Sequence, residues 1–221
     1  PVAAAAAAPA AAAKAAPPVA ANAGGPATAQ QATIRVDLDR VDRLINAVGE
    51  LVIQQAMLSQ RVLESAGYTV HLSAVPGERP LCCGRTFLAA GLVDEARAEA
   101  RRAIDTLLPF VTRGVAVVGL EPSCLLTMRD EFLQYGLGDA ARQLADNSFL
   151  FEEFLVREHA AGRFAPTLKP VGHAEALLHG HCHQKAFDAV RPVEQVLSWI
   201  PGLKTSLIES SCCGMAGNFG Y

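Results

Sequence analysis

The sequence has no uninterrupted run of about 18 apolar residues, the length that a membrane-spanning helix needs. The sequence also lacks a large excess of charge of either sign, because it has 19 lysines and arginines and 22 acidic residues. No cluster of basic residues offers a surface for nucleic acid. The spacing Cys-x-x-Cys, typical of zinc sites, does not occur. We therefore expect a cytoplasmic protein, at most peripheral at the inner membrane face, that binds no nucleic acid.

Residues 1–31 contain almost no charge, since Lys14 is their one charged residue. The segment is rich in alanine, which favours helix, and in proline, which interrupts it. It has neither the basic start nor the leucine-rich centre of a signal peptide. We expect a disordered Ala/Pro-rich linker over residues 1–31.

The next segment, residues 32–64, has apolar residues at helical intervals: Val41, Leu44, Ile45, Val48, Leu51 and Val52. Asp37 or Asp39 is placed to cap the helix. The spacing predicts one amphipathic helix of about six turns. Its apolar side carries no catalytic residue type, so we expect that side to pack on its own domain or on a partner helix.

From residue 65 onward, segments typical of buried strands alternate with segments typical of helices. We expect strands within residues 68–73, 114–124, 175–182 and 204–213. We expect helices within residues 93–111 and 144–159, and after Cys124 and Cys182. This alternation predicts an α/β fold in which duplicated βα units form a small parallel or mixed sheet.

Six cysteines follow the expected strands, in two Cys-Cys-Gly triplets and two single positions: Cys82, Cys83, Cys124, Cys182, Cys212 and Cys213. Because ligands collect at the carboxyl edge of α/β sheets, we expect these thiols to face a common crevice. A cytoplasmic chain keeps its thiols reduced, and thiolates are the ligands of iron–sulfur clusters. We therefore expect an iron–sulfur cluster, with zinc as the inorganic competitor. The four preferred ligands are Cys83, Cys124, Cys182 and Cys213.

Glycines and histidines border the cysteines. Gly84 and Gly214 let the backbone approach a cluster without a Cβ atom. If the strand persists, His181 and His183 lie on one side of it, where they hydrogen-bond a cluster sulfide or relay a proton. The alternative is that one of them caps the following helix.

Charged residues also stand beside the cysteines. Arg85 and Lys185 either offset the charge of a cluster or lie at the surface. Glu121 either orients Arg129 or faces solvent. The sequence leaves both alternatives open.

Two stretches within residues 33–62, "IRVDLDRVDRLINAVGELVI" and "QAMLSQR", resemble the start of the dimerisation domain of CheA-type chemotaxis histidine kinases. In that family the domain is a helical hairpin that pairs with its twin into a four-helix bundle, and the first helix of that hairpin is recognisable here. The resemblance implies a homodimer formed through this helix. One functional hypothesis is therefore a kinase fragment that acts as a dimerisation or interaction module.

Residues 66–221 resemble the cysteine-rich CCG domain of heterodisulfide reductase subunits, of glycolate oxidase and glycerol-3-phosphate dehydrogenase iron–sulfur subunits, and of FAD-linked oxidases similar to D-lactate dehydrogenase. The matching stretches are "LCCGRTFLAAG", "GLEPSC", "HGHCHQKA" and "SSCCGMAGNFGY". The resemblance implies an iron–sulfur domain, of the 4Fe–4S type, that passes electrons in the oxidation of a 2-hydroxy acid. It implies two further partners: a flavin domain or subunit that carries FAD, and an electron carrier or quinone.

The chain departs from that second family in ways that bear on activity. The ferredoxin-like cysteine module is missing, no part resembles the flavin domain, and the kinase-like helix stands where an earlier βα element belongs. We expect residues 65–221 to be a truncated CCG domain joined to the kinase-like helix near residues 62–65. Such a fragment is not expected to be catalytically competent alone.

Overall fold

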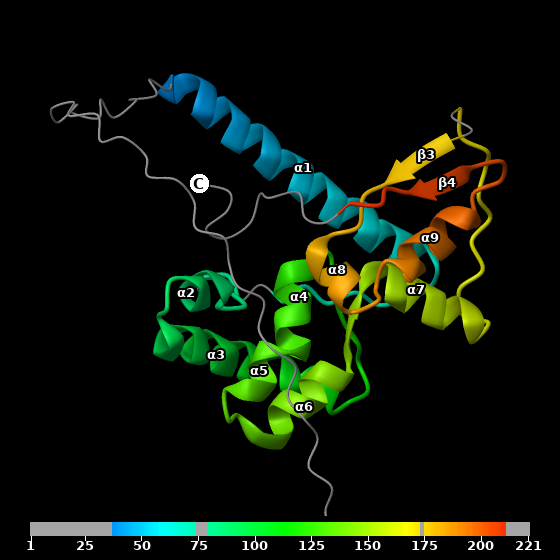
Figure 1. The fold of residues 1–221 in the computed structure, drawn as a ribbon. Helices are drawn as coiled ribbons and strands as arrows, with labels where there is room; N and C mark the ends of the chain where they lie inside the picture. Colours follow the sequence, from blue (N-terminus) through cyan, green and yellow to red (C-terminus); the bar gives the residue numbers. More distant parts are fainter. Residues whose placement is uncertain (1–36, 74–78, 173–174, 211–221) are drawn as a thin grey trace, which may run out of the picture. The chain divides into compact units, whose positions relative to one another are not determined.

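A computed structural model of the chain describes residues 37–73, 79–172 and 175–210 (Figure 1). The chain divides into two units, residues 1–45 and residues 46–221. The expected linker over residues 1–31 lies outside the described residues, and so do Cys212, Cys213 and Gly214. None of the helices in the described ranges is long and apolar enough to cross a membrane.

The first helix, α1 (Leu38–Ser65), is the amphipathic helix that the sequence predicts. Asp37 caps it, because one carboxylate oxygen accepts hydrogen bonds from the backbone N–H groups of Asp39 and Arg40, at 3.0 and 3.4 Å. Near its C-terminal end Leu63 is buried, in a cluster with Phe154, Leu155 and Phe164.

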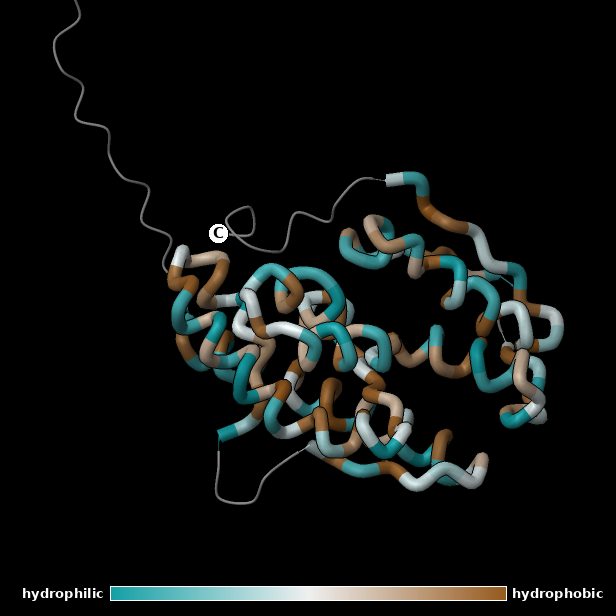
Figure 2. The backbone as a smooth tube through the Cα atoms, turned by 90° about the horizontal axis from the view of Figure 1, so that it is seen from below, coloured by the Kyte–Doolittle hydropathy of each residue, from teal (hydrophilic) through white to brown (hydrophobic). Residues whose placement is uncertain are grey.

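After α1, short strands alternate with helices. The helices are α2 (Arg85–Ala89), α3 (Val93–Val111), α4 (Pro122–Arg129), α5 (Glu131–Gln134), α6 (Gly138–Asp146), α7 (Phe151–Ala160), α8 (Cys182–Ala186) and α9 (Arg191–Ser198). The strands are β1 (Val117–Gly119), β2 (Ser148–Leu150), β3 (Glu175–Leu178) and β4 (Lys204–Leu207). Figure 2 shows hydrophilic and hydrophobic residues alternating along the helices, as expected for helices with one buried side.

The described strands form two parallel two-stranded sheets. In the first, β1 pairs with β2 and Val117 lies opposite Ser148. In the second, β3 pairs with β4 and Glu175 lies opposite Lys204; the two arrows lie side by side in Figure 1. Parallel pairing needs a crossover connection, and helices supply it in both sheets. The α/β fold class is therefore confirmed.

Several expected boundaries are wrong. Residues 68–73 do not form a strand, and residues 148–150 within the expected helix 144–159 form β2. Helix α6 ends at Asp146, the Ser148 hydroxyl donates to the carbonyl of Leu144 at 2.7 Å, and the chain then extends beside β1. The expected strands are also shorter, since β1 ends at Gly119 and β3 ends at Leu178.

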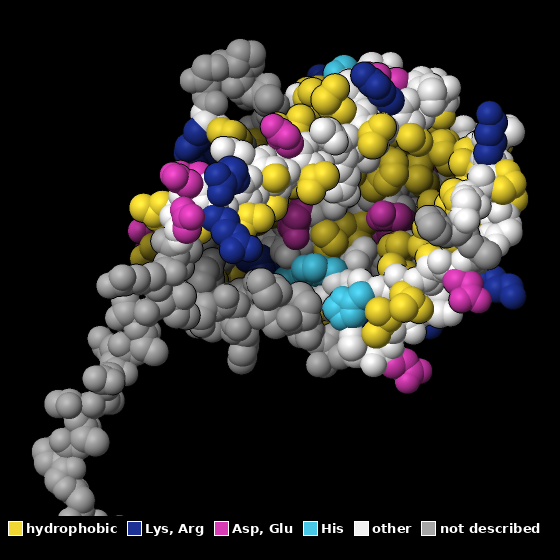
Figure 3. Space-filling model, turned by 90° about the horizontal axis from the view of Figure 1, so that it is seen from above, with side chains coloured by type: hydrophobic (Ala, Val, Ile, Leu, Met, Phe, Trp, Pro, Cys, Tyr) yellow, Lys and Arg dark blue, Asp and Glu magenta, His cyan; other side chains and the backbone are white. Residues whose placement is uncertain are grey.

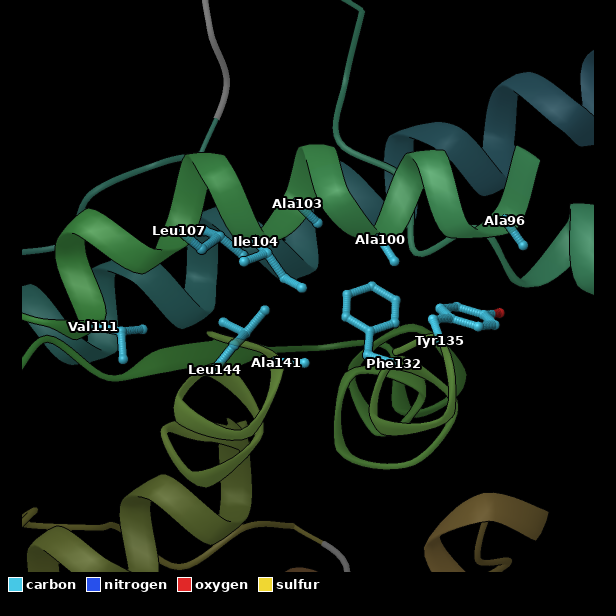
Figure 4. Packing of buried hydrophobic residues seen from close by; sticks show 10 residues of the cluster. All are labelled: Ala96, Ala100, Ala103, Ile104, Leu107, Val111, Phe132, Tyr135, Ala141 and Leu144. Carbon is cyan, nitrogen blue, oxygen red and sulfur yellow. The ribbon is translucent and has the colours of Figure 1, made fainter. Parts of the chain in front are cut away.

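A core of small and large side chains holds α3 against α5 and α6. Ala96, Ala100 and Ala103 on α3 are all fully buried, and Figure 4 shows them facing the helices that carry Phe132 and Leu144. Alanine at these positions lets the helices approach closely, and the large side chains fill the remaining space. This core fixes α3, on which the turn before α2 packs.

A buried carboxylate ties the segment after α1 to α7. Glu158 is only 4% exposed and pairs with Arg157 and Arg163, at 3.0 and 2.6 Å. It also accepts a hydrogen bond from the hydroxyl of Tyr68 at 2.9 Å, while the Tyr68 ring meets Phe154 edge-on. The hydrogen bonds from Arg163, Tyr68 and Arg157 outweigh burial and lower the pKa of Glu158 to about 2.

The Glu158→Gln substitution is expected to flatten the acid dependence of stability. The ordinary pKa of this carboxyl is 4.5, so the folded state binds fewer protons than the unfolded state between about pH 5 and pH 2. The stabilisation is present above this range and is lost as the pH falls through it. The pKa difference corresponds to roughly 3 kcal/mol at most.

Urea unfolding at several pH values, followed by circular dichroism, measures this contribution. Between about pH 5 and pH 3, the unfolding free energy of the unsubstituted chain should fall more steeply than that of Glu158→Gln. The control is Glu95→Gln, an exposed carboxylate on α3, which should follow the unsubstituted chain. Equal slopes for the unsubstituted chain and Glu158→Gln would contradict this account of Glu158.

Candidate metal centre

The turn that carries Cys82 and Cys83 depends on Gly84. Its φ is +75°, in the left-handed region that favours glycine, and a Cβ atom here would lie 2.8 Å from the carbonyl oxygen of Ala96. The backbone N–H of Gly84 also donates to the sulfur of Cys82 at 3.4 Å. Within the described residues, the absence of a Cβ atom at Gly84 therefore allows this turn to approach α3 closely.

Cys124 lies in the first turn of α4. Pro122 begins this helix, and the Glu121 side chain caps it by accepting a hydrogen bond from the backbone N–H of Cys124. Burial opposes ionisation of Glu121, but hydrogen bonds from Cys124 and Ser123 hold its pKa below the ordinary value. The alternative in which Glu121 orients Arg129 is wrong, because Arg129 pairs with Glu153 at 2.7 Å.

Two of the predicted ligands meet directly. The sulfur atoms of Cys83 and Cys124 are 3.2 Å apart, although 41 positions separate the residues in the sequence. The hydrogen bond from the Cys124 thiol favours the thiolate of Cys83 and lowers the pKa of Cys83 to about 6. The same bond, together with burial, raises the pKa of Cys124.

His181 and His183 border Cys182 in a different way from the one expected. Because strand β3 ends at Leu178, the alternation of side chains along a strand does not determine where the two histidines lie. His181 instead caps α8: its Nδ1 accepts a hydrogen bond from the backbone N–H of His183 at 3.2 Å. The capping alternative is thus the correct one for His181. The two imidazole rings still stack, with centroids 5.3 Å apart.

His181 also brings the start of α8 beside the start of α4. Its Nε2 lies 3.4 Å from the hydroxyl oxygen of Ser123, the residue before Cys124. Its Nδ1 lies 3.9 Å from the sulfur of Cys182. One imidazole therefore lies between the two helix starts that carry Cys124 and Cys182.

His183 has a nitrogen atom without a partner. Its Nδ1 is buried and makes no hydrogen bond, while burial and then the charges of Arg85 and His181 lower its pKa. Donor atoms of His181, Cys182 and His183 lie within 4.8 Å of one another. An unpaired buried imidazole nitrogen beside a thiol fits a site that takes a metal ion or a cluster.

The cations beside the cysteines already have partners. Arg85 forms an ion pair with Glu131 at 2.6 Å, and the Lys185 ammonium donates to the carbonyl of Ser210 at 2.7 Å. The ion pair of Arg85 is partly buried, whereas the hydrogen bond of Lys185 lies at the surface. The ion pair with Glu131 lowers the net positive charge that Arg85 offers to a cluster.

Cys82, Cys83 and Cys124 lie on the wall of a pocket of about 870 Å³. Apolar side chains dominate the rest of this wall, among them Leu63, Leu107, Phe110, Leu125 and Phe154. Figure 3 shows one face of the molecule on which hydrophobic side chains form a broad area, with acidic and histidine side chains beside it.

The structure thus brings Cys82, Cys83 and Cys124 to the wall of one pocket. Cys182 is not among the residues that line this pocket; its sulfur lies near the His181 imidazole, which contacts Ser123, the residue before Cys124. Cys212, Cys213 and Gly214 belong to the predicted site but lie outside the described residues. Sequence reasoning missed the contact of Ser123 with His181 and the capping role of Glu121. The Glu-Pro pair directly before Ser-Cys was a signal for the cap, because proline favours the first helical position.

Comparison with known proteins connects the N-terminal region to histidine kinases. The family described as "Signal transducing histidine kinase, homodimeric domain" matches residues 31–85. The chemotaxis protein CheA of Rhizobium meliloti is 78% identical over 37 residues, which is 17% of this chain and 5% of CheA. These matches confirm the first resemblance.

Two other relatives match a larger part of the chain. One subunit of the anaerobic glycerol-3-phosphate dehydrogenase of Escherichia coli K12 is 29% identical over 162 residues, which is 73% of this chain and 39% of that protein. Lactate utilization protein A of Bacillus subtilis is 28% identical over 149 residues, 64% of this chain and 59% of that protein. The chain thus spans about two fifths of the length of the first of these relatives. These matches confirm the second resemblance; no solved structure matches.

Substitution of Gly84 is expected to disturb the thiol pair more than substitution of a similar glycine elsewhere. Gly84→Ala adds a Cβ in contact with Ala96, whereas Gly91→Ala, at φ +79°, adds one with no atom within 4 Å. Both substitutions place an alanine in the left-handed backbone region, which costs about 1–2 kcal/mol. Only Gly84→Ala adds crowding, which costs about 1–3 kcal/mol more.

Urea unfolding measures the stability difference, and alkylation of Cys83 with peptide mass analysis measures its accessibility. Gly84→Ala should unfold at a lower urea concentration than Gly91→Ala and should expose Cys83 to faster alkylation. The assigned role of Gly84 would be refuted if both variants behaved alike.

Proposed function

We propose that residues 65–221 are an iron–sulfur electron-transfer domain of an FAD-linked oxidoreductase. In this proposal, residues 1–31 are a linker and residues 32–64 are a kinase-dimerisation-like helix. The domain passes electrons and does not bind FAD itself, because FAD belongs to a separate domain or subunit.

The observation that carries the proposal is the meeting of cysteines from separate elements. Cys83 comes from the turn before α2, and Cys124 comes from the start of α4, yet their sulfur atoms are 3.2 Å apart. Cys182 begins α8, which His181 joins to Ser123. Thiols that converge from distant parts of a chain are what a shared cluster requires.

The residues that would hold the cluster are Cys83, Cys124, Cys182 and Cys213, with Cys82 and Cys212 as the remaining candidates. A cluster of the 4Fe–4S type takes four thiolates and supplies one-electron transfer when it is bound. The depressed pKa of Cys83 favours the thiolate that a metal needs. We propose that His183, whose buried Nδ1 has no hydrogen-bond partner, donates to a cluster sulfur or moves a proton.

The printed names of the relatives suggest where the electrons come from. One is a subunit of an anaerobic glycerol-3-phosphate dehydrogenase and the other is a lactate utilization protein. We propose that the electrons come from a small hydroxylated substrate, a 2-hydroxy acid such as lactate, through a flavin domain or subunit. An electron carrier or a quinone receives them.

Anaerobic reconstitution with iron and sulfide tests the proposal. The chain should bind about four iron atoms and give the electron paramagnetic resonance signal of a cluster after reduction. Cys83→Ser, Cys124→Ser and Cys182→Ser should each lose most of this iron.

Cys82→Ser is the matched control, because Cys82 adjoins Cys83 but is not a preferred ligand. It should retain most of the iron, and circular dichroism should show that all variants are folded. Iron content that does not change in Cys83→Ser, Cys124→Ser and Cys182→Ser would overturn the proposal.

A second candidate function is that of a dimerisation module, and one observation on α1 favours it. Val48, Leu51, Leu58 and Val62 are exposed and recur at intervals that place them on one face of the helix. The matching family is described as a homodimeric domain. We propose that this face of α1 pairs with the same face of a second chain.

Sedimentation velocity of the full chain tests this second candidate. Leu51→Glu and Leu58→Glu should weaken the dimer at least about tenfold, because a buried charge without a partner disfavours association. Ile53→Glu is the control, since Ile53 is as exposed as Leu58 but lies on the other side of α1. A chain that is monomeric without substitution, or an equal effect of all three changes, would exclude the candidate.

A further inference from the structure

The contact between Cys83 and Cys124 suits a second kind of chemistry that needs no metal. Their sulfur atoms are 3.2 Å apart, and a disulfide bond requires about 2.05 Å. The two sulfurs therefore need to approach by only about 1 Å.

The two thiols differ in their access to solvent. Cys124 is exposed, whereas Cys83 is only 7% exposed. Both lie on the wall of the pocket of about 870 Å³. An oxidant in solution therefore meets Cys124 first, while Cys83 remains shielded behind it.

The residues around the pair hold the two sulfurs in place. Leu81 and Phe87, on either side of Cys83, pack against the core formed with α3. Leu125, which follows Cys124, is buried against Leu150 in a second cluster. The two thiols are thus positioned by packed cores on both sides, which favours reaction between them over reaction with other thiols.

We propose that Cys83 and Cys124 form a reversible disulfide when the chain meets a small disulfide oxidant such as glutathione disulfide. As its thiol proton passes to the Cys83 sulfur, 3.2 Å away, the Cys124 sulfur attacks glutathione disulfide, forms a mixed disulfide and releases one glutathione as a thiolate. The Cys83 sulfur then attacks the Cys124 sulfur and releases the second glutathione. The two thiols of the chain are oxidised by two electrons, and their protons pass to the two glutathione molecules.

The neighbouring cysteines have other surroundings. The sulfur of Cys82 accepts a hydrogen bond from the backbone N–H of Gly84, and the sulfur of Cys182 lies beside the His181 imidazole. The proposal is therefore specific to Cys83 among the two adjacent cysteines. It goes beyond the proposed function, because the disulfide forms in a chain without iron and removes two of the four preferred cluster ligands.

Peptide mass analysis of the full chain, prepared without iron, tests the proposal. The chain is equilibrated in buffers of increasing glutathione disulfide, alkylated and digested with trypsin without reduction. A peptide spanning residues 62–85 should become joined to one spanning residues 114–129, with a loss of two hydrogen atoms. Fragmentation should place the bond at Cys83, and dithiothreitol should reverse it.

Variants sharpen the result. Cys82→Ser should retain the joined peptides, while Cys83→Ser should lose them and leave glutathione attached to Cys124. A bond at Cys82, a bond from Cys124 to the peptide that contains Cys182, or glutathione on Cys124 of the unsubstituted chain without any joined peptide would each overturn the proposal. The assay needs no iron, so its failure is distinguishable from failure of the cluster proposal.

Discussion

The arrangement of the cysteines depends on how closely the turn that carries Cys82, Cys83 and Gly84 approaches α3. The carbonyl oxygen of Ala96 occupies the space that a Cβ of residue 84 would need, and glycine alone also adopts the φ of +75° comfortably. The alanine face of α3 packs against Phe132 and Leu144, so the helix cannot retreat from the turn without opening a cavity. Cys83 is thereby held where Cys124 reaches it, and the chemistry of both thiols follows from that position.

Much of the fold follows from local patterns in the sequence. Helical periodicity and a capping aspartate define α1, because both signals act within one helix and need no tertiary contact. The α/β class follows from the alternation of strand-like and helix-like segments, and the parallel pairing of both sheets agrees with it. The expectation that Cys83, Cys124 and Cys182 follow strands toward a common place rests on the same alternation.

The predictions of strands and helices that are wrong concern segments whose structure depends on tertiary contacts. Residues 148–150 become β2 because they pair with β1, a partner about 30 positions away that no local pattern reveals. Residue 68 does not begin a strand; its hydroxyl is held by Glu158, 90 positions away. The strand before Cys182 ends at Leu178, and Gly180 then lies so close to Val190 that a Cβ atom there would clash. His181 then caps a helix, which strand alternation does not predict.

The central claim is that thiols from separate elements of this chain bind iron together. Iron X-ray absorption of the full chain, reconstituted under anaerobic conditions, tests it most directly because it reports the atoms around the metal. The account predicts a first shell of sulfur and a second shell of iron, as in a cluster held by thiolates. A first shell of nitrogen and oxygen with no iron neighbour would contradict it.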